Sequence, residues 1–445
     1  MTHYTNLLFS DKDLLHQRFF TTDLGELYRA IPFEELAAQI PATKHEQSGK
    51  GCKPWFNVKG GLGLMFLKHY LGLSDALLIE RINTDWSMQL FCGISLAPTE
   101  KISDTNLPSY WRGYFGMHMD IHSLQQVFAK HWKPLMNQTQ IGMQDATCYE
   151  SRIEYPTDIK LLWKSCDRVH TILQKERRKK GFRKSRVKFG KRKKEFLEYQ
   201  LCKKKTKAKE RAMRKKLLAF LLKLMNLLED VSAAISIGNA IKMRTILKVY
   251  EQQHHKAYGN PDEKIKDRIV SLSKPYIRPI VRGKEAKPVE FGAKVNKLIV
   301  DGIGFIDHFS YDAFNECTKF KSGISLQRAL FGKCTHQGAD KIYATNENRA
   351  YCKEQNIETN FIPKGKQKEI FIDQAAILRK ELNKERGTVL EGSFGNDKNH
   401  YLLQKVNARN RYTEKCWIFF GIHTANASKI AARIIEKELQ NSRAA

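Results

Sequence analysis

Glu391 and Lys398 stand seven residues apart in a segment that we predict to be helical. Seven residues are close to two turns of an α-helix, so the two side chains share one face, about 10 Å apart along the axis. A carboxylate can hold a divalent cation, and a lysine can hold a phosphate group. The pair therefore predicts metal-dependent chemistry on a phosphodiester.

Two aspartates, Asp145 and Asp340, are the expected partners of Glu391. Phosphodiester cleavage by two magnesium ions about 4 Å apart needs several shared carboxylates. Asp145 lies in a predicted strand among mostly uncharged residues, where an unpaired charge would be costly. Asp340 lies at a predicted strand end, a common place for sites in open sheets. We expect the three carboxylates to lie within about 8 Å of one another.

Five other polar residues have simpler interpretations. Asp301 precedes a glycine, which is typical of a turn. Asp307 could approach the site from the second strand of a hairpin, but it ranks below Asp340. Asp397 is one position off the face of the helix that carries the catalytic Glu. His308 and His336 could assist proton transfer, although a single histidine is more often structural.

Positive charge dominates the chain and is concentrated in one segment. The formal net charge is +30, which favours nucleic acid as a partner over an anionic membrane surface. Residues 171–216 hold 22 Lys and Arg against four Glu. Such a segment is either a solvated, partly disordered linker or a DNA-binding arm, and we favour the arm. Its densest runs contain the predicted phosphate contacts Arg177, Arg178, Lys179, Lys180, Lys191, Arg192, Lys193 and Lys194.

Composition excludes several other classes of protein. No run of 18 or more apolar residues occurs, so we expect no membrane span, and the N-terminal residues lack the layout of a secretion signal. Nine dispersed cysteines without a C-x-x-C pair predict reduced thiols and a cytoplasmic protein. Cys334 and His336 lack a second ligand pair, which makes structural zinc improbable. No G-x-x-x-x-G-K-[ST] loop occurs, so ATP is not implied.

The order of the predicted elements indicates an α/β protein. Cap residues predict short helices before residue 138, including helices that begin at Ser74-Asp75, Asp85-Trp86 and Ser103-Asp104. Strand patterns follow at 140–150 and in a hairpin at 294–309. We then expect a helix at 311–320, a weak strand ending at Asp340, a helix at 347–355, a strand at 357–362 and long helices from 372. This order predicts a mixed sheet flanked by helices.

Four segments organise the predicted chain. Residues 1–138 form a helical domain for DNA binding or dimerisation, and residues 139–165 begin the catalytic core. Residues 166–285 form a basic helical insertion, and residues 286–445 complete the core with C-terminal helices. Leucines recurring at three- and four-residue steps between 215 and 250 predict an amphipathic helix or a helical hairpin bent near Gly238.

Six segments in this order resemble the bacterial insertion-sequence transposases with an Asp-Asp-Glu (DDE) site. The chain is most similar to the insertion-sequence-five group with a helical N-terminal domain. The segments are 145–147, 155–158, 278–284, 290–295, 339–343, and 391–395 with Lys398. One departure concerns Arg386, which lies five residues before Glu391, while Gly387 occupies the position where the family often has an arginine.

The resemblance implies an RNase-H-like core in which Asp145, Asp340 and Glu391 are the catalytic metal ligands. It further implies that Lys398 contacts transposon-end DNA, and we expect Arg386 to hold a phosphate as well. The expected cofactor is Mg²⁺, as two ions, with Mn²⁺ as a substitute. The expected partners are double-stranded DNA, both the terminal inverted repeats and the target, and a second copy of the chain on DNA. The expected place is the bacterial nucleoid.

The sequence thus predicts a DNA transposase that cleaves element ends and joins the freed 3′-hydroxyl to target DNA. Two alternatives stay open. One is a DNA endonuclease on the same fold without strand transfer. The other is a non-catalytic DNA-binding derivative of a transposase, against which the intact acid triad argues.

Overall fold

The computed structural model describes residues 11–50, 53–231, 235–260, 263, 265–281, 288–364 and 372–444. The chain divides into two compact units. The first comprises Met1–Ser151, Ala293–Ser310 and Phe314–Ala445, and the second comprises Arg152–Gly292 and Tyr311–Ala313. The second unit contains the predicted insertion and extends beyond it at both ends. Cys52 and the last three residues of the 278–284 motif lie outside the described residues.

Short helices with side-chain caps build the N-terminal part of the first unit. The predicted caps Ser74 and Asp85 accept hydrogen bonds from first-turn amides. The helix predicted from Ser103-Asp104 instead begins at Leu107, because Asp104 caps a local turn by accepting from the amide of Asn106. The helices are α1 (Asp11–Phe19), α2 (Asp23–Arg29), α3 (Phe33–Ala38), α4 (Lys44–Ser48), α5 (Val58–Leu71), α6 (Asp75–Ile82), α7 (Trp86–Phe91), α8 (Leu107–His118) and α9 (Ile121–Trp132).

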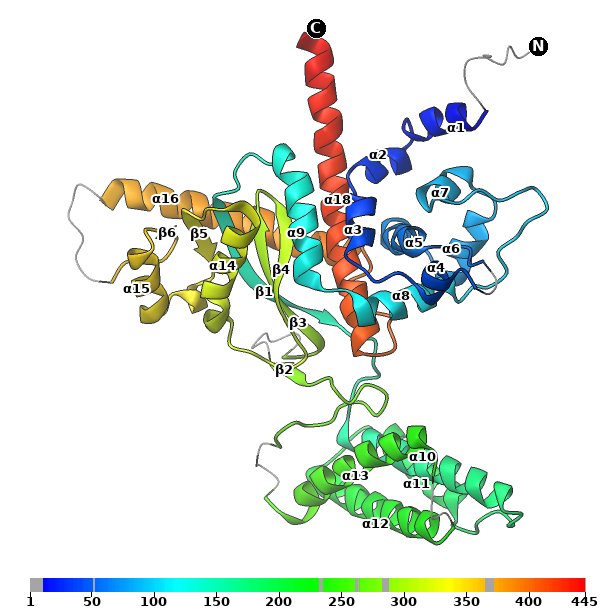
Figure 1. The fold of residues 1–445 in the computed structure, drawn as a ribbon. Coiled ribbons are helices and arrows are strands. Elements are labelled where there is room, and N and C mark those ends of the chain that lie inside the picture. Colours follow the sequence, from blue (N-terminus) through cyan, green and yellow to red (C-terminus); the bar gives the residue numbers. More distant parts are fainter. Residues whose placement is uncertain are drawn as a thin grey trace. The chain divides into compact units, whose positions relative to one another are not determined.

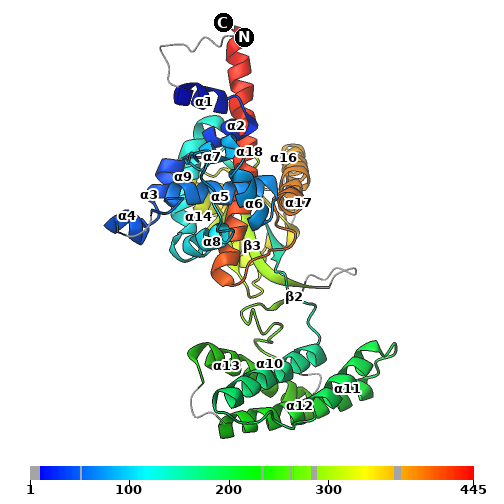
Figure 2. The same cartoon turned by 90° about the vertical axis from the view of Figure 1, so that its right-hand side faces the viewer.

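The long C-terminal helix α18 (Arg411–Ala444) packs among these helices (Figures 1 and 2). The ring of Phe420 on α18 lies 5.2 Å from that of Phe66 on α5 and 5.8 Å from that of Phe115 on α8. Gly116 permits the close approach of α8, since a Cβ there would lie 2.6 Å from the carbonyl oxygen of Tyr412. The two ends of the chain therefore share one apolar core.

A mixed sheet forms the centre of the first unit. Its strands are β1 (Ile141–Glu150), β3 (Val289–Val300), β4 (Ile303–Ser310), β5 (His336–Ala339) and β6 (Glu358–Thr359). The short strand β2 (Pro279–Val281) and residues 289–291 of β3, with which it pairs, belong to the second unit. The order is β2-β3-β1-β5-β6, with β4 paired to β3. Asp301 and Gly302 form the predicted hairpin turn with φ of 49° and 77°. β1 pairs in parallel with β5, and β5 with β6.

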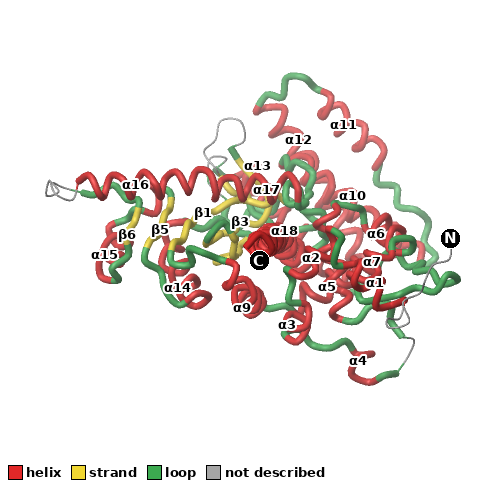
Figure 3. The backbone as a smooth tube through the Cα atoms, turned by 90° about the horizontal axis from the view of Figure 1, so that it is seen from above, coloured by secondary structure: helices red, strands yellow, loops and turns green. Residues whose placement is uncertain are grey.

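Helices lie on both faces of this sheet (Figure 3). The helix predicted at 311–320 is wrong: a 3₁₀ turn occupies Glu316–Lys319, and the helix α14 is Phe320–Phe331. The strand predicted at 357–362 shrinks to the two residues of β6. The remaining elements are the 3₁₀ turn η3 (Lys341–Tyr343), α15 (Asn346–Glu354), α16 (Ile372–Glu385), the π-helical turn η5 (Arg386–Leu390) and α17 (Glu391–His400).

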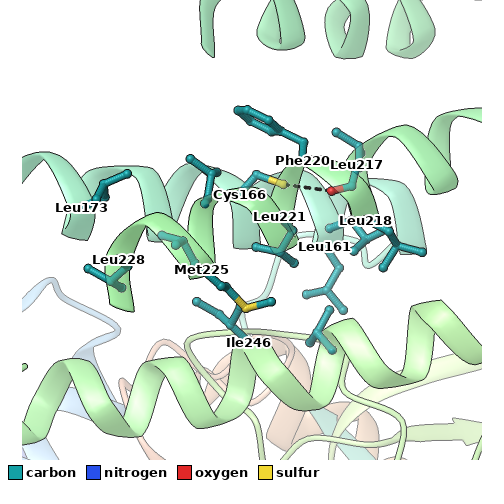
Figure 4. Packing of buried hydrophobic residues seen from close by; sticks show 14 of the residues in the cluster. Leu161, Cys166, Leu173, Leu217, Leu218, Phe220, Leu221, Met225, Leu228 and Ile246 are labelled. Carbon is teal, nitrogen blue, oxygen red and sulfur yellow. Dashed lines mark hydrogen bonds between the residues drawn. The ribbon is translucent and has the colours of Figure 1, made fainter. Parts of the chain in front are cut away.

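The second unit is a helical bundle with its own core. Its helices are α10 (Asp158–Lys179), α11 (Phe189–Leu201), α12 (Lys207–Val231) and α13 (Ile237–Tyr258). Leucines from α10 and α12 interdigitate with Ile246 of α13, and the thiol of Cys166 donates to the carbonyl of Leu217 at 3.6 Å (Figure 4). Buried Asp158 binds Lys256 and Arg268 at 2.8 Å each, and Arg214 at 3.5 Å. These ion pairs connect α10, α12 and α13.

Among the described residues, no single helix is long and apolar enough to cross a membrane. One bent pair, α5 with α6 at 112°, passes by length and composition alone, and α5 is largely buried inside the protein.

Candidate active site

The two faces of β1 contact different helices. Successive strand residues point to opposite faces, so even-numbered and odd-numbered positions separate. On the even face, the amide of Gln144 donates to the carbonyl of Lys319 at 2.7 Å, next to α14. On the odd face, Met143 packs against Leu390, the last residue of η5. Asp145 is on the odd face and therefore faces η5 and α17.

The next odd residues extend this contact along α17. The ammonium of Lys398 donates to the hydroxyl of Thr147 at 2.9 Å, and its Nζ lies 5.9 Å from the centre of the Tyr149 ring. The hydroxyl of Tyr149 donates to the carboxylate of Asp397 at 2.6 Å. One face of β1 thus holds the helix that carries Glu391 at its start and Lys398 two turns later.

Strand register brings the two aspartates together. The parallel pairing of β1 with β5 ends at Gln144 opposite Ala339, and the next residues are Asp145 and Asp340. Asp340 is exposed, and its carboxylate accepts from the amide of Lys341 at 2.7 Å at the start of η3. Two residues 195 positions apart are therefore neighbours at the point where β5 ends beside the middle of β1.

The electrostatics of Asp145 reflect these neighbours. The pKa of this carboxyl is raised from 3.8 to about 6, mainly by burial and also by the negative charges of Glu316 and Asp340. The amide of Ala146 and the guanidinium of Arg386 act in the opposite direction. Burial and the neighbouring acids thus disfavour the charged form of Asp145, and a bound cation would favour it.

Glu391 begins α17 and is linked to Asp145 through Arg386. The amide of Glu391 donates to the carbonyl of Arg386, five residues earlier, which is the hydrogen bond of a π-helix. Nη1 of the Arg386 side chain lies 3.8 Å from Oε1 of Glu391, and 64% of the Glu391 side chain is exposed. The π-helical turn holds one extra residue, so an arginine five positions before Glu391 reaches it as an arginine four positions before would in an α-helix.

The ligand types fit a hard divalent cation, since aspartate and glutamate oxygens are what Mg²⁺ prefers. The arrangement differs from the expected one. In the part of the chain that the structure describes, no three His, Cys, Asp or Glu side chains are grouped to hold a metal ion. Asp145 and Asp340 are neighbours, whereas Glu391 pairs with Arg386.

The residues with simpler interpretations have structural contacts. Asp301 binds Arg433 at 2.8 Å beside the hairpin turn. Asp307 accepts from Asn296 at 2.7 Å and from Ser322 at 2.8 Å, and burial raises its pKa. Both bonds of Asp307 go to the same oxygen, Oδ2, and connect β4 to β3 and α14.

The predicted phosphate contacts of the second unit lie on folded helices. Arg177, Arg178 and Lys179 end α10, and the run from Lys191 to Lys194 lies in α11. Glu176 binds Lys179, and Glu195 binds Arg192, which leaves most of the charge in the segment without an acidic counterpart. The interpretation of residues 171–216 as a partly disordered linker is therefore wrong for this structure.

Sequence reasoning missed two groups around the site, Glu316 and Lys297, and the role of Asp397 as the partner of Lys297. Glu316 interacts electrostatically with Asp145. Lys297 and Asp397 form a buried ion pair next to Lys398. A signal for Lys297 was present, because a lysine within the apolar run 295–300 must find a buried partner. Glu316 carried no such signal.

Comparison with known protein families gives a match in the N-terminal region. The family described as Transposase domain (DUF772) matches residues 15–113, which span most of the N-terminal helices. This match supports a transposase family. No curated protein and no solved structure matches the chain.

Proposed function

We propose that this protein is a DNA transposase of the DDE type, which cleaves the ends of an insertion sequence and joins them to target DNA. The observation that carries the proposal is the neighbouring position of Asp145, in the middle of β1, and Asp340, directly after the parallel strand β5, with Glu391 linked to Asp145 through Arg386. The match of residues 15–113 to a transposase domain supports it independently.

Each residue has a distinct proposed role. Asp145, Asp340 and Glu391 would hold Mg²⁺, which when bound stabilises charge on the attacking and leaving oxygens. Arg386 neutralises part of the acidic cluster and contacts a phosphate once Glu391 is engaged. Lys398, held beside Thr147, binds the backbone of the end DNA. The basic helices of the second unit bind phosphates without regard to sequence.

The RNase-H-like description of the core is part of this proposal. What supports it is the mixed sheet, in which a hairpin precedes two parallel strands and helices cover both faces. The proposed mechanism is attack of water on the phosphodiester at the element end, followed by attack of the freed 3′-hydroxyl on target DNA. Because the attacking oxygen, the phosphorus atom and the leaving oxygen must lie in line, the main task of the protein is to position them.

The test uses DNA that carries the sequences flanking the gene, with Mg²⁺. Nicking of the intact ends and joining of pre-cut ends to a plasmid are the expected results. Nicking without joining would favour an endonuclease on the same fold. Binding without nicking would favour a non-catalytic DNA-binding derivative. The absence of both binding and nicking would refute the proposal.

A further inference from the structure

A buried ion pair lies where α17 faces β3. The ammonium of Lys297 is 2.6 Å from the carboxylate of Asp397, and each side chain is only 1% exposed. Lysine and aspartate are rarely buried so completely unless they are paired. This pair is one position away from Lys398 along the helix, but it contacts none of the three proposed metal ligands.

Further hydrogen bonds connect the pair to two places on α17 and to a second strand. Lys297 also donates to the hydroxyl of Ser393 at 2.7 Å, one helical turn before Asp397. Tyr149 on β1 donates to the same oxygen of Asp397 at 2.6 Å. Two contacts one turn apart fix both the position of a helix along its axis and its rotation about it.

The local backbone directs Lys297 to this place. The pairing of β3 with β4 shifts register between Asn296 and Lys297, and such irregularities re-aim a side chain. Gly304 on β4 leaves room for the lysine stem, because a Cβ there would lie 2.1 Å from Cε of Lys297. A strand irregularity and a glycine thus combine to accommodate one buried cation.

Stability alone is a poor explanation for this arrangement. Replacing a buried ion pair by apolar residues is often neutral or stabilising, because desolvation offsets the attraction between the charges. Buried ion pairs are better attested as devices that fix register. The element whose register is fixed here begins with Glu391 and carries Lys398.

We propose that Lys297 is a positioning residue: through Asp397 and Ser393 it sets the rotation of α17, and thereby the direction of Glu391 at the start of this helix and the contact of Lys398 with Thr147. This inference rests on the proposed function for its consequence in catalysis. Its structural part, the control of α17 by Lys297, can be measured without DNA or metal.

The test compares Lys297→Met with the parent in the full-length protein. Hydrogen exchange of the α17 amides without metal should become at least about tenfold faster, while exchange in β1 changes little. The Mg²⁺ concentration for half-maximal nicking should rise about tenfold, as expected when a group that orients a ligand is lost. The nicking rate of pre-bound DNA at saturating Mg²⁺ should fall about 100-fold.

Two more variants separate positioning from general stability. Tyr149→Phe removes only one hydrogen bond to Asp397 and should shift α17 exchange and Mg²⁺ dependence in the same direction, by about threefold. Arg433→Met removes a partly buried ion pair at the hairpin turn and should change neither quantity. Tyr149→Phe keeps the inference falsifiable if Lys297→Met does not fold.

Parent-like α17 exchange and Mg²⁺ dependence in Tyr149→Phe or Lys297→Met would overturn the inference. Uniformly faster exchange across the first unit, with unchanged Mg²⁺ dependence, would also overturn it. A parent that does not nick DNA would refute the proposed function instead, while hydrogen exchange would still test the positioning of α17.

Discussion

The acidic site of the first unit and the basic helices of the second unit use charge in different ways. In the acidic site each charge has a fixed place: Asp145 on one face of β1, Asp340 at the next strand end, Arg386 in a π-helical turn. In the basic unit, charges repeat along exposed helix surfaces, with few acidic partners. The first arrangement suits chemistry at one atom, and the second suits the binding of a polyanion without regard to its sequence.

This difference predicts that a single substitution in the acidic site strongly reduces nicking, whereas DNA binding by the second unit depends on the summed charge of residues 171–216. Asp145→Asn should reduce nicking by about 10³-fold or more, since a fixed electrostatic contact in the site is lost. DNA affinity should stay at the parent value, because no phosphate contact is removed. Nicking and binding are measured side by side with the same DNA.

Asp301→Asn is the matched control for this prediction. Asp301 adopts a φ of 49°, which asparagine tolerates, and it lies at the hairpin turn. Its variant should nick at nearly the parent rate. An Asp145→Asn protein that nicks like the parent would show that the wrong acid had been assigned.

Neutralising charge in the second unit should have the next largest effect. Replacing Lys191, Lys193 and Lys194 by Gln should weaken DNA binding roughly 10- to 100-fold at moderate salt and lower the slope of log affinity against log salt by about 2 to 3. The measurement is a binding titration at several salt concentrations. An unchanged slope would contradict the claim that the second unit binds DNA phosphates through this segment.

Three exposed cations outside the 171–216 segment provide the control. Lys242, Arg244 and Lys248 all lie on α13. Their replacement by Gln removes the same charge from the same unit and should change the slope by less than about 1. Equal slopes for the two triple variants would mean that position within the unit is irrelevant.

Lys398 shares a feature with each region. Like the acidic residues it has a fixed place, beside Thr147, and like the basic helices it is proposed to bind a phosphate. Lys398→Ala should weaken the binding of pre-cut ends by about tenfold and leave Mg²⁺ binding nearly unchanged. Lys398→Arg should keep part of the activity, since charge matters more than shape at a single phosphate. Loss of metal binding with intact DNA affinity would contradict the proposed role, and calorimetry of both ligands distinguishes the cases.

The smallest predicted effect is on stability without metal. The pKa of Asp145 is raised in the folded protein to about 6, so the folded state holds a proton that the unfolded state has lost between pH 4 and 6. Stability therefore falls as pH rises through this window. Asp145→Asn should be more stable than the parent by about 1 kcal/mol at pH 8, a value discounted for partial exposure, and equal to it near pH 4. Urea unfolding at both pH values tests this, and a destabilised variant at pH 8 would contradict it.

The strands that carry Asp145 and the hairpin were predictable because they alternate or run apolar between clear turn residues. The start of α14 was not, because residues 311–320 carry apolar residues at helical spacing while the chain must first turn through Glu316–Lys319. The short strand β6 was overestimated for a similar reason, since its apolar flanks pack against α14 and α15 without pairing.

For the candidate site, the residue types were predictable and the contacts between them were not. The register of β1 with β5 brings Asp145 beside Asp340, but register over a separation of 195 residues is not encoded locally. The π-helical turn before Glu391 and the partner of Lys297 depend on tertiary packing. Gly387 lies in this turn, but a glycine alone does not predict a π-helical turn.

The central claim is that Asp145, Asp340 and Glu391 bind the catalytic metal together. The most direct measurement is anomalous diffraction from crystals of the protein with end DNA and Mn²⁺. The account predicts a Mn²⁺ peak between Asp145 and Asp340, with the carboxylate of Glu391 released from Arg386 and within about 8 Å of both aspartates. A Mn²⁺ peak at other ligands, or well-ordered DNA and metal with Glu391 still paired to Arg386, would contradict it.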